Sequence, residues 1–285
     1  MADIGAYLRR LEVGHEGPPS VEALRTLHAA HVERIAYEAL DVQLGLVNSI
    51  QPADSVERIT RHGRGGYCYH LNGALSVLLT TLGYDVVWHR AGVQGRDAAE
   101  PPGPRQANHL ALTVRGLPAP ECPEGEWLVD AGLGDGLHEP LPLVEGEYAQ
   151  GPLTFGLRRS EVAPGGWRLD HDPRGSFRGM DFETAHATVE HFQERHVVLS
   201  TSPDSGFVRT CAVLRRDAKG VDTLTGCVFK RVDGSPEAAR TIESEKEWFE
   251  VLDDVFGLRL LDLDDTARTR LWAKVAAAHE AWQQR

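Results

Sequence analysis

The apolar residues of this chain change their period near residue 85. Upstream, the segment "SVEALRTLHAAHVERIAY" repeats its apolar positions at helical spacing, whereas "DVVWHRAGV", "NHLALTV" and "EWLVDAG" alternate apolar and polar residues like strands. Strands that follow one another without helices between them do not build a parallel sheet. The order therefore predicts an α+β fold, with helices first, then an antiparallel sheet or barrel, then a mixed third part.

The first third carries the start and stop signals of helices. One helix begins after Ser20, a typical N-cap residue, and "PADSVERITRHG" has Pro52 near its start and Gly63 at its end. A third helix, "YCYHLNGALSVLLTTLG", ends at Gly83. The pattern places Cys68 in the first turn of this helix and on its apolar face.

The second half predicts further strands and two terminal helices. The expected strands are "WRLDH", "HVVLSTS", "FVRTCAVLRR" and "TLTGCVFKRV", and the helices are "SEKEWFEVLDDVFG" and "DTARTRLWAKVAAAHEAWQ". No internal repeat interrupts this order.

The net charge limits the kinds of binding partner, and the cysteine content indicates the cellular compartment. The 42 acidic and 30 basic residues give a net charge of −12, which disfavours nucleic acid and anionic membranes, although a local basic pocket for a small anionic ligand stays open. The sequence has no secretion signal and no membrane span. Its four cysteines show neither CxxC pairing nor zinc-ligand spacing, so we expect a reduced, cytoplasmic protein.

Cys68 is a candidate nucleophile. A thiol in the first turn of a helix lies near the positive end of the helix dipole and near unpaired N–H groups, and both stabilise the thiolate. The same N–H groups could hold an oxyanion, and Gly65 and Gly66 could let a substrate carbonyl approach the sulfur. The alternative is a glycine-rich turn that leads into an ordinary helix.

A thiol nucleophile needs a base, and the base needs a group that orients it. His109 lies in the strand "NHLALTV", and Asp130 ends the next strand, after "WLV". A buried carboxylate is stabilised by a partner on the neighbouring strand, which favours a pair of His109 with Asp130. The alternative is a half-exposed histidine and an aspartate that opens a turn.

Two other patterns carry weaker signals. The glycines of "GLGDG", residues 132 to 136, are not followed by a helix, which excludes a dinucleotide fingerprint but leaves an anion nest or a plain turn. His186, His191 and His196 are spaced five apart and share no helix or strand face, so we expect surface or packing histidines and no metal site.

Five segments together resemble the arylamine N-acetyltransferases. "RGGYCYHLN" resembles the signature "RGGxCxExN" of that family. "ERIAYEALDV", "NHLALTV", "WLVDAGLGDGLHEPLPL" and "TSPDSGFVRT" resemble its other motifs, in the same order. The resemblance covers nearly the whole chain.

The resemblance implies a fold, a catalytic triad and a reaction. The fold would be an N-terminal helical bundle (1–84), a central antiparallel β-barrel (85–195) and a C-terminal α/β lid (196–285), with a papain-like cysteine-enzyme core. Cys68, His109 and Asp130 would form the triad. Acetyl-CoA would acetylate the cysteine, and a small arylamine, arylhydrazine or hydrazide would then take the acetyl group by a ping-pong mechanism, in a monomer or homodimer.

The resemblance also assigns contacts around the triad. The acceptor pocket maps onto Tyr37, Val93, Leu133 and Phe207. The expected contacts with the cofactor map onto Gly132, Gly134 and Asn108.

Some residues depart from the family pattern. His70 replaces a glutamate expected to pair with Arg64, so Arg64 would need another acid or His70 would stay neutral. Leu133 and Tyr37 replace phenylalanines, which removes one aromatic wall and adds a hydroxyl. Two alternatives therefore remain: an amide synthase that uses a longer acyl thioester, and a ligand-binding homologue without turnover.

Overall fold

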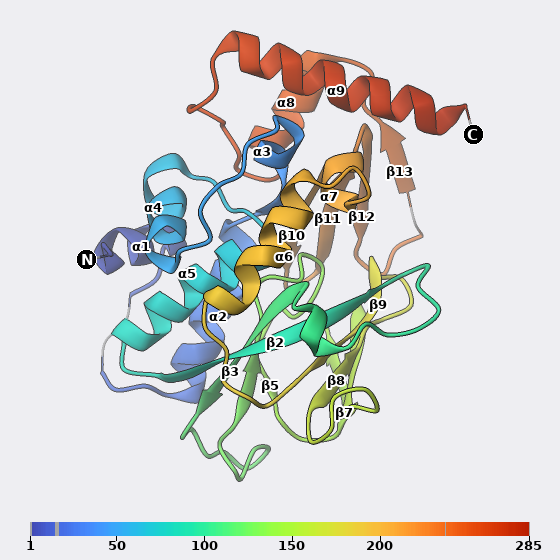
Figure 1. The fold of residues 1–285 in the computed structure, drawn as a ribbon. Coiled ribbons are helices and arrows are strands. Elements are labelled where there is room, and N and C mark those ends of the chain that lie inside the picture. Colours follow the sequence, from blue (N-terminus) through green and yellow to red (C-terminus); the bar gives the residue numbers. More distant parts are fainter. Residues whose placement is uncertain (1, 15–16, 237, 285) are drawn as a thin grey trace.

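The computed structural model describes residues 2–14, 17–236 and 238–284 and confirms an α+β fold (Figure 1). The N-terminal part is helical. It contains α1 (Ile4–Leu11), α2 (Val21–Arg34), α3 (Leu40–Gln43), α4 (Pro52–His62) and α5 (Cys68–Thr81).

A curved sheet of eight antiparallel strands forms a nearly closed barrel beside these helices. Its spatial order is β5-β4-β3-β2-β9-β8-β7-β6. The strands are β2 (Asp85–Gly95), β3 (His109–Arg115), β4 (Trp127–Val129), β5 (Leu141–Pro142), β6 (Gly146–Gln150), β7 (Leu153–Arg159), β8 (Trp167–Asp170) and β9 (Phe177–Phe182). A short 3₁₀ turn, η1 (Pro104–Gln106), lies in the connection from β2 to β3.

The third part is a second antiparallel sheet with helices. The sheet has the order β1-β10-β11-β12-β13, so that β1 (Tyr37–Glu38) from the helical part forms its edge. Its other strands are β10 (Ala212–Asp217), β11 (Gly220–Thr225), β12 (Val228–Val232) and β13 (Ala238–Thr241). The accompanying helices are α6 (Glu190–Thr201), α7 (Gly206–Arg209), α8 (Glu245–Asp254) and α9 (Asp265–Gln283).

The predicted helix signals in the first third are confirmed. The Ser20 side chain accepts a hydrogen bond from the N–H of Ala23, Pro52 occupies the first turn of α4, and Gly63 ends that helix with φ +64°. Cys68 is the first residue of α5, as the spacing predicts.

Three predicted strands differ from the structure. The first half of "FVRTCAVLRR" lies in helix α7, and its second half forms strand β10 from Ala212. "HVVLSTS" lies in helix α6, because the residues that this helix buries are Phe192, His196 and Ser200, while the apolar Val197 and Val198 are exposed. Consecutive β-branched and apolar residues therefore indicated a strand where polar side chains provide much of the buried face. "TLTGCVFKRV" is a hairpin of β11 and β12, in which Gly226 takes φ +57° in the turn.

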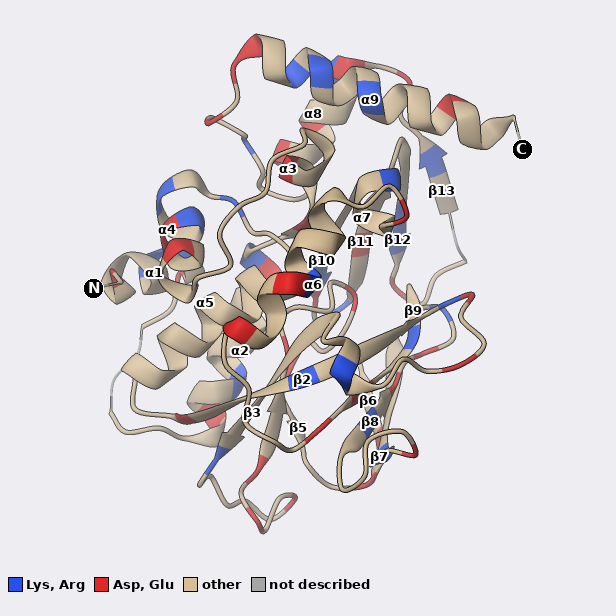
Figure 2. Cartoon of the chain, viewed as in Figure 1, with Lys and Arg blue, Asp and Glu red and all other residues tan. Residues whose placement is uncertain are grey.

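The buried apolar side chains form three clusters. One joins the N-terminal helices to β3 and β4, one fills the barrel, and one lies between the second sheet and helices α8 and α9. Charged residues of both signs are spread over all three parts (Figure 2). Within the described residues, none of the helices is both long and apolar enough to cross a membrane.

Candidate active site

Helix α5 places Cys68 against the end of strand β4. The sulfur belongs to the first residue of the helix, and the N-cap residue Tyr67 makes no side-chain capping bond. The first N–H groups of a helix lack intrahelical acceptors, so the dipole of α5 favours negative charge here. Gly132 allows the close approach, because a Cβ at this position would lie 2.7 Å from the Cα of Cys68.

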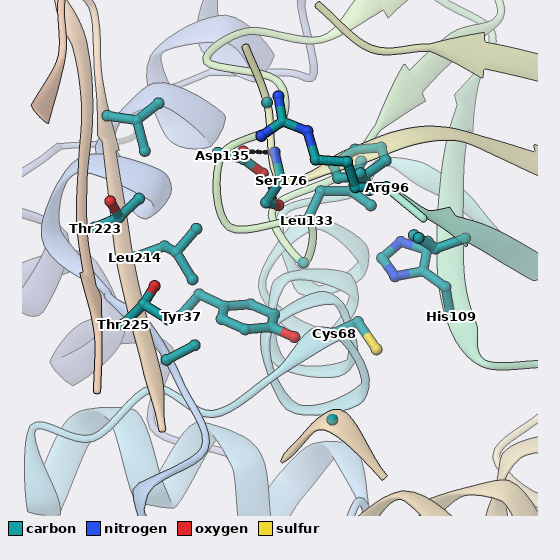
Figure 3. Close-up of a pocket in the computed structure, with 18 of the residues that line it drawn as sticks. Tyr37, Cys68, Arg96, His109, Leu133, Asp135, Ser176, Leu214, Thr223 and Thr225 are labelled. Carbon is teal, nitrogen blue, oxygen red and sulfur yellow. Dashed lines mark hydrogen bonds between the residues drawn. The ribbon is translucent and has the colours of Figure 1, made fainter. Parts of the chain in front are cut away.

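His109 and Asp130 are paired beside this cysteine. The Nε2 atom of His109 lies 2.7 Å from Oδ2 of Asp130, and both side chains are buried. The pair joins the first residue of β3 to the residue after β4, which are neighbouring strands. Figure 3 shows the sulfur of Cys68 next to the His109 ring. The structure therefore brings together the three residues that the sequence predicts as a triad.

Electrostatics favour a charged His109. Burial lowers the pKa of this imidazole, but the charge of Asp130, the neighbouring Cys68 thiol and hydrogen bonds to both outweigh burial and raise the pKa above its ordinary value. With Nε2 directed at Asp130, the other ring nitrogen, Nδ1, is the one left to exchange a proton with the sulfur.

Asn72 fixes the position of Asp130, a role that was not predicted from the sequence. Its side-chain amide donates to Oδ1 of Asp130 (2.8 Å) and to the carbonyl of Leu110 (2.6 Å), and its oxygen accepts from the N–H of Ala131 (2.9 Å). The signal was available, because Asn72 follows Cys68 by four residues and so lies on the same face of the helix.

His28 fixes the backbone of Asp130. Its Nδ1 atom lies 2.9 Å from the carbonyl oxygen of His138 and therefore carries the proton, so Nε2 accepts the N–H of Asp130 at 3.2 Å. Burial lowers the pKa of His28, which keeps it neutral in this role. Nothing in the sequence distinguished His28 among 13 histidines.

A pocket of about 640 Å³ opens beside Cys68 and His109, a volume in the range of small-molecule sites. The four expected acceptor residues all line it: Tyr37, Val93, Leu133 and Phe207. The rings of Tyr37 and Phe207 meet edge to face at 6.4 Å, and Figure 3 shows the Tyr37 hydroxyl directed toward Cys68.

The residues expected to contact the cofactor have protein partners. The N–H of Gly132 donates to Asp130, and the amide of Asn108 makes two bonds with the backbone of Val93. Both residues line the pocket. Gly134 takes φ +74° and packs against Leu214 and Tyr37. Their contact with a cofactor stays a prediction.

Gly65 and Gly66 are needed for packing of the backbone. A Cβ at Gly65 would lie 1.9 Å from the carbonyl oxygen of Ala36, and one at Gly66 would lie 2.7 Å from the His70 side chain. The N–H of Glu38 donates to the carbonyl of Gly66 at 2.9 Å. These glycines thus bring β1 against the start of α5, and the residues lining the pocket do not include them.

Arg64 has acidic partners that replace the missing glutamate. Its guanidinium is fully buried and donates to Glu38, to Asp41 (2.9 Å) and to Asp262 (2.8 Å). His70 stays neutral, because burial and the nearby Arg58 lower its pKa to about 3. Within the described residues, both ring nitrogens of His70 lack a hydrogen-bond partner.

The spaced histidines serve different purposes. His186 and His191 are exposed, whereas His196 is buried, with Nδ1 2.5 Å from the Tyr67 hydroxyl and Nε2 2.7 Å from the carbonyl oxygen of Asn48. In the part of the chain that the structure describes, no group of three or more His, Cys, Asp or Glu side chains could hold a metal ion.

Comparisons with known proteins agree on one family. The N-acetyltransferase family model matches residues 20–265. The arylamine N-acetyltransferase of Mycobacterium bovis is 28% identical over 267 residues, with 92% of each chain covered. The pineal gland isozyme of arylamine N-acetyltransferase from Gallus gallus is 28% identical over 247 residues, covering 79% of this chain and 81% of the relative.

A solved structure shares the fold over nearly its whole length. The arylamine N-acetyltransferase of Mycobacterium marinum in complex with CoA is 26% identical, with a TM-score of 0.83, and the match covers 97% of this chain and 99% of the other.

Proposed function

This chain belongs to the N-acetyltransferase family that includes the arylamine N-acetyltransferases, and from that premise we propose that it transfers the acetyl group of acetyl-CoA to the nitrogen of small arylamines, arylhydrazines or hydrazides. The observation that carries the proposal is the buried series of Cys68, His109 and Asp130, in which Cys68 and His109 line one pocket and Asp130 binds His109 from behind. Such a series is the chemical requirement for acyl transfer through a thioester.

In the first half-reaction, Cys68 is the nucleophile. His109 takes the thiol proton, and the resulting thiolate attacks the carbonyl carbon of the acetyl thioester. As the new S–C bond forms and the old one breaks, CoA leaves as a thiolate that receives the proton from the imidazolium. Asp130 keeps the ring in the required tautomer and stabilises its charged form.

In the second half-reaction, the amine takes the place of CoA in the pocket. Its nitrogen attacks the acetyl carbon of the thioester, the bond from carbon to Cys68 breaks, and His109 accepts the proton that the nitrogen loses. Because the second substrate uses the space left by the first, one pocket of about 640 Å³ serves both steps. This order of events predicts ping-pong kinetics.

The start of α5 suits the tetrahedral intermediate. The negative charge that forms on the acetyl oxygen lies close to the sulfur, and so close to the first N–H groups of the helix. Preorganised N–H groups of this kind stabilise an oxyanion without reorganisation during the reaction.

The decisive experiment is intact-protein mass spectrometry after incubation with acetyl-CoA alone. We expect one added acetyl group, located on the peptide that contains Cys68, absent in Cys68→Ala and retained in Cys122→Ala, whose buried thiol donates to the carbonyl of Glu126. The acetylated protein should then lose the group to an added arylamine. A folded protein that accepts only long acyl thioesters would instead support an amide synthase.

We further propose that the protein works as a monomer or homodimer in the cytoplasm, without nucleic-acid partners. Its net charge of −12 supports the last point. Light scattering of the purified chain would test the oligomeric state, and a higher oligomer would contradict it.

A further inference from the structure

Basic side chains surround the active-site pocket at a distance from Cys68. Arg96, Arg174 and Lys230 line the main pocket. A neighbouring cavity of about 160 Å³ is lined by the same three residues and by Arg231. We call these four residues the basic rim.

The basic rim joins three separate elements of the fold. Arg96 follows β2, Arg174 lies in the turn between β8 and β9, and Lys230 and Arg231 belong to β12 of the second sheet. In Figure 2, the Lys and Arg positions at the end of β2 and on β12 mark this junction of barrel and lid. Four cations converge here although the whole chain carries a net charge of −12.

The acidic groups near the rim already have partners, and several of them pair with rim residues. Asp135, which also lines the pocket, accepts two hydrogen bonds from Ser176, one from its N–H (2.6 Å) and one from its hydroxyl (2.8 Å). Two rim residues have acidic partners of their own. Arg174 pairs with Asp172 at 2.8 Å, and Arg231 pairs with Asp217, Asp222 and Asp233. Among the described residues that line the 160 Å³ cavity, none is acidic.

Arg96 is the rim residue whose charge is best placed to bind a ligand. It is exposed, and its guanidinium donates to the carbonyl of Pro173. Within the described residues, no carboxylate lies at ion-pair distance from it, although Asp97 follows it directly and Glu100 lies in the same loop. A planar guanidinium with unused N–H groups is suited to bind phosphate.

The position of Arg96 relative to Cys68 indicates which ligand it binds. Figure 3 shows Arg96 beside Ser176 and Asp135, away from Cys68, with both residues on the same pocket. A coenzyme A thioester has its acyl group at one end of a long arm and its phosphates at the other. With the acetyl carbon at Cys68, the phosphates must lie remote from the sulfur, whereas a small acceptor amine stays near it.

We propose that the basic rim, with Arg96 as its central residue, binds the phosphate groups of the acetyl-CoA donor. This inference rests on the proposed acetyl transfer and adds to it a phosphate subsite made of named side chains. It also accounts for the local basic pocket in an acidic protein, because a polyanionic substrate is attracted to a cationic entrance.

The test compares two acetyl donors. Acetyl-CoA carries phosphates, and S-acetylpantetheine is the same arm without them. We expect Arg96→Ala to raise the KM for acetyl-CoA about tenfold, the loss typical of one charge-assisted hydrogen bond, and to leave the KM for S-acetylpantetheine unchanged. Arg96→Lys, which keeps the charge, should recover part of the loss.

Arg259→Ala is the matched control, because Arg259 is an exposed arginine that pairs with Asp253, far in sequence from the rim. Its KM values should equal those of the wild type. The KM for acetyl-CoA should also rise with salt in the wild type and rise less in Arg96→Ala.

Three outcomes would overturn the assignment. An unchanged KM for acetyl-CoA would show that the rim binds no phosphate, and equal losses with both donors would show that Arg96 only supports the loop. If Arg96→Ala instead weakened the binding of para-aminobenzoate but not of aniline, the bound anion would be a carboxylate of the acceptor. Failure of the proposed function looks different, since wild-type Cys68 would then accept an acetyl group from neither donor.

Discussion

The start of helix α5 separates two groups of charged side chains that behave differently, and each group has a buried centre. On one side lies the catalytic cluster of Cys68, Asn72, His109 and Asp130, of which Cys68 and His109 line the pocket. On the other side lie Glu38, Asp41, Arg58, Arg64 and Asp262, the arginine cluster, where two guanidinium groups bind three carboxylates. Only the first contains a cation that can lose its proton.

The difference follows from the kind of cation each cluster contains. Burial raises the pKa of Glu38, but Arg64 and Arg58 outweigh burial and hold it well below its ordinary value. Glu38 therefore keeps its charge well below the ordinary range of a carboxyl group, and the arginine cluster contributes to structure. In the catalytic cluster a single carboxylate raises the pKa of a histidine, and that proton can be transferred to a substrate.

The largest expected effect comes from Asp130→Asn, which makes the catalytic cluster neutral. We expect kcat to fall by about 10⁴-fold, because the imidazolium loses its stabilising charge and the ring loses its enforced tautomer. Steady-state kinetics with acetyl-CoA and an arylamine would measure it. The melting temperature at neutral pH should also fall, because the charged pair of His109 and Asp130 is lost, although Asn72 and Gly132 can still donate to the remaining amide oxygen.

The same variant tests the pKa of His109. In the wild type this pKa is raised above the ordinary 6.5. Its contribution to stability is therefore complete below the pKa of the unfolded chain and is lost as the pH rises through the higher pKa of the folded state. In Asp130→Asn the burial of the ring remains without its counterion, so the pKa should fall. NMR titration of His109 would show this, and an unchanged pKa would contradict the role of Asp130.

Arg64→Ala should lower stability and leave the activity of the folded protein nearly unchanged. Removal of one partner from a buried ion pair costs about 3–5 kcal/mol of unfolding free energy, because the carboxylates of Glu38 and Asp41 are left partly unpaired. Urea denaturation would measure this loss, and the activity of the remaining folded protein should stay close to that of the wild type. Arg61→Ala is the control, since Arg61 is 74% exposed and its loss should change stability by no more than about 0.5 kcal/mol.

The sequence predicted one of these two clusters far better than the other. Cys68, His109 and Asp130 stood out because each belongs to a recognisable pattern, namely a helix start, a strand face and a strand end. Asn72 could have been found from its spacing. The partners of Arg64 could not, because Asp262 lies 198 residues away and only tertiary folding brings it close.

For the fold, too, locally determined features were predicted correctly and features that depend on distant residues were not. Helix starts at Ser20 and Pro52 are local, and they were predicted correctly. The segment "HVVLSTS" was not, because α6 buries His196 and Ser200 only by virtue of hydrogen bonds to Tyr67, which lies 129 positions before His196. A polar residue that is buried through a distant partner leaves no signal in the hydrophobic pattern of its own segment.

A smaller effect is expected from His70→Glu, which restores the family residue. A fourth acid would enter a region where three carboxylates already share two guanidinium groups, and we expect a loss of about 1–3 kcal/mol of unfolding free energy. Thermal denaturation at neutral pH would measure it. A more stable variant would show that Arg58 or Arg64 can bind a further carboxylate, and the charges of the arginine cluster would then not be balanced in the wild type.

The smallest expected effect lies at strand β1, which touches both clusters. Successive residues of a strand point to opposite sides, so that Tyr37 lines the pocket while Glu38 binds Arg64. Burial and then the nearby Cys68 raise the pKa of Tyr37, which keeps its hydroxyl protonated and able to donate a hydrogen bond.

Tyr37→Phe removes this donor and leaves the shape of the pocket. We expect the KM for para-methoxyaniline, whose oxygen accepts a hydrogen bond, to rise about two- to tenfold relative to that for para-methylaniline, the effect of one neutral hydrogen bond. Stability should not change, because the backbone of β1 and its neighbour Glu38 are untouched. If Tyr37→Phe lowered stability while the two KM values kept their ratio, Tyr37 would have a structural role like that of the arginine cluster. Strand β1 would then carry structural residues on both of its faces.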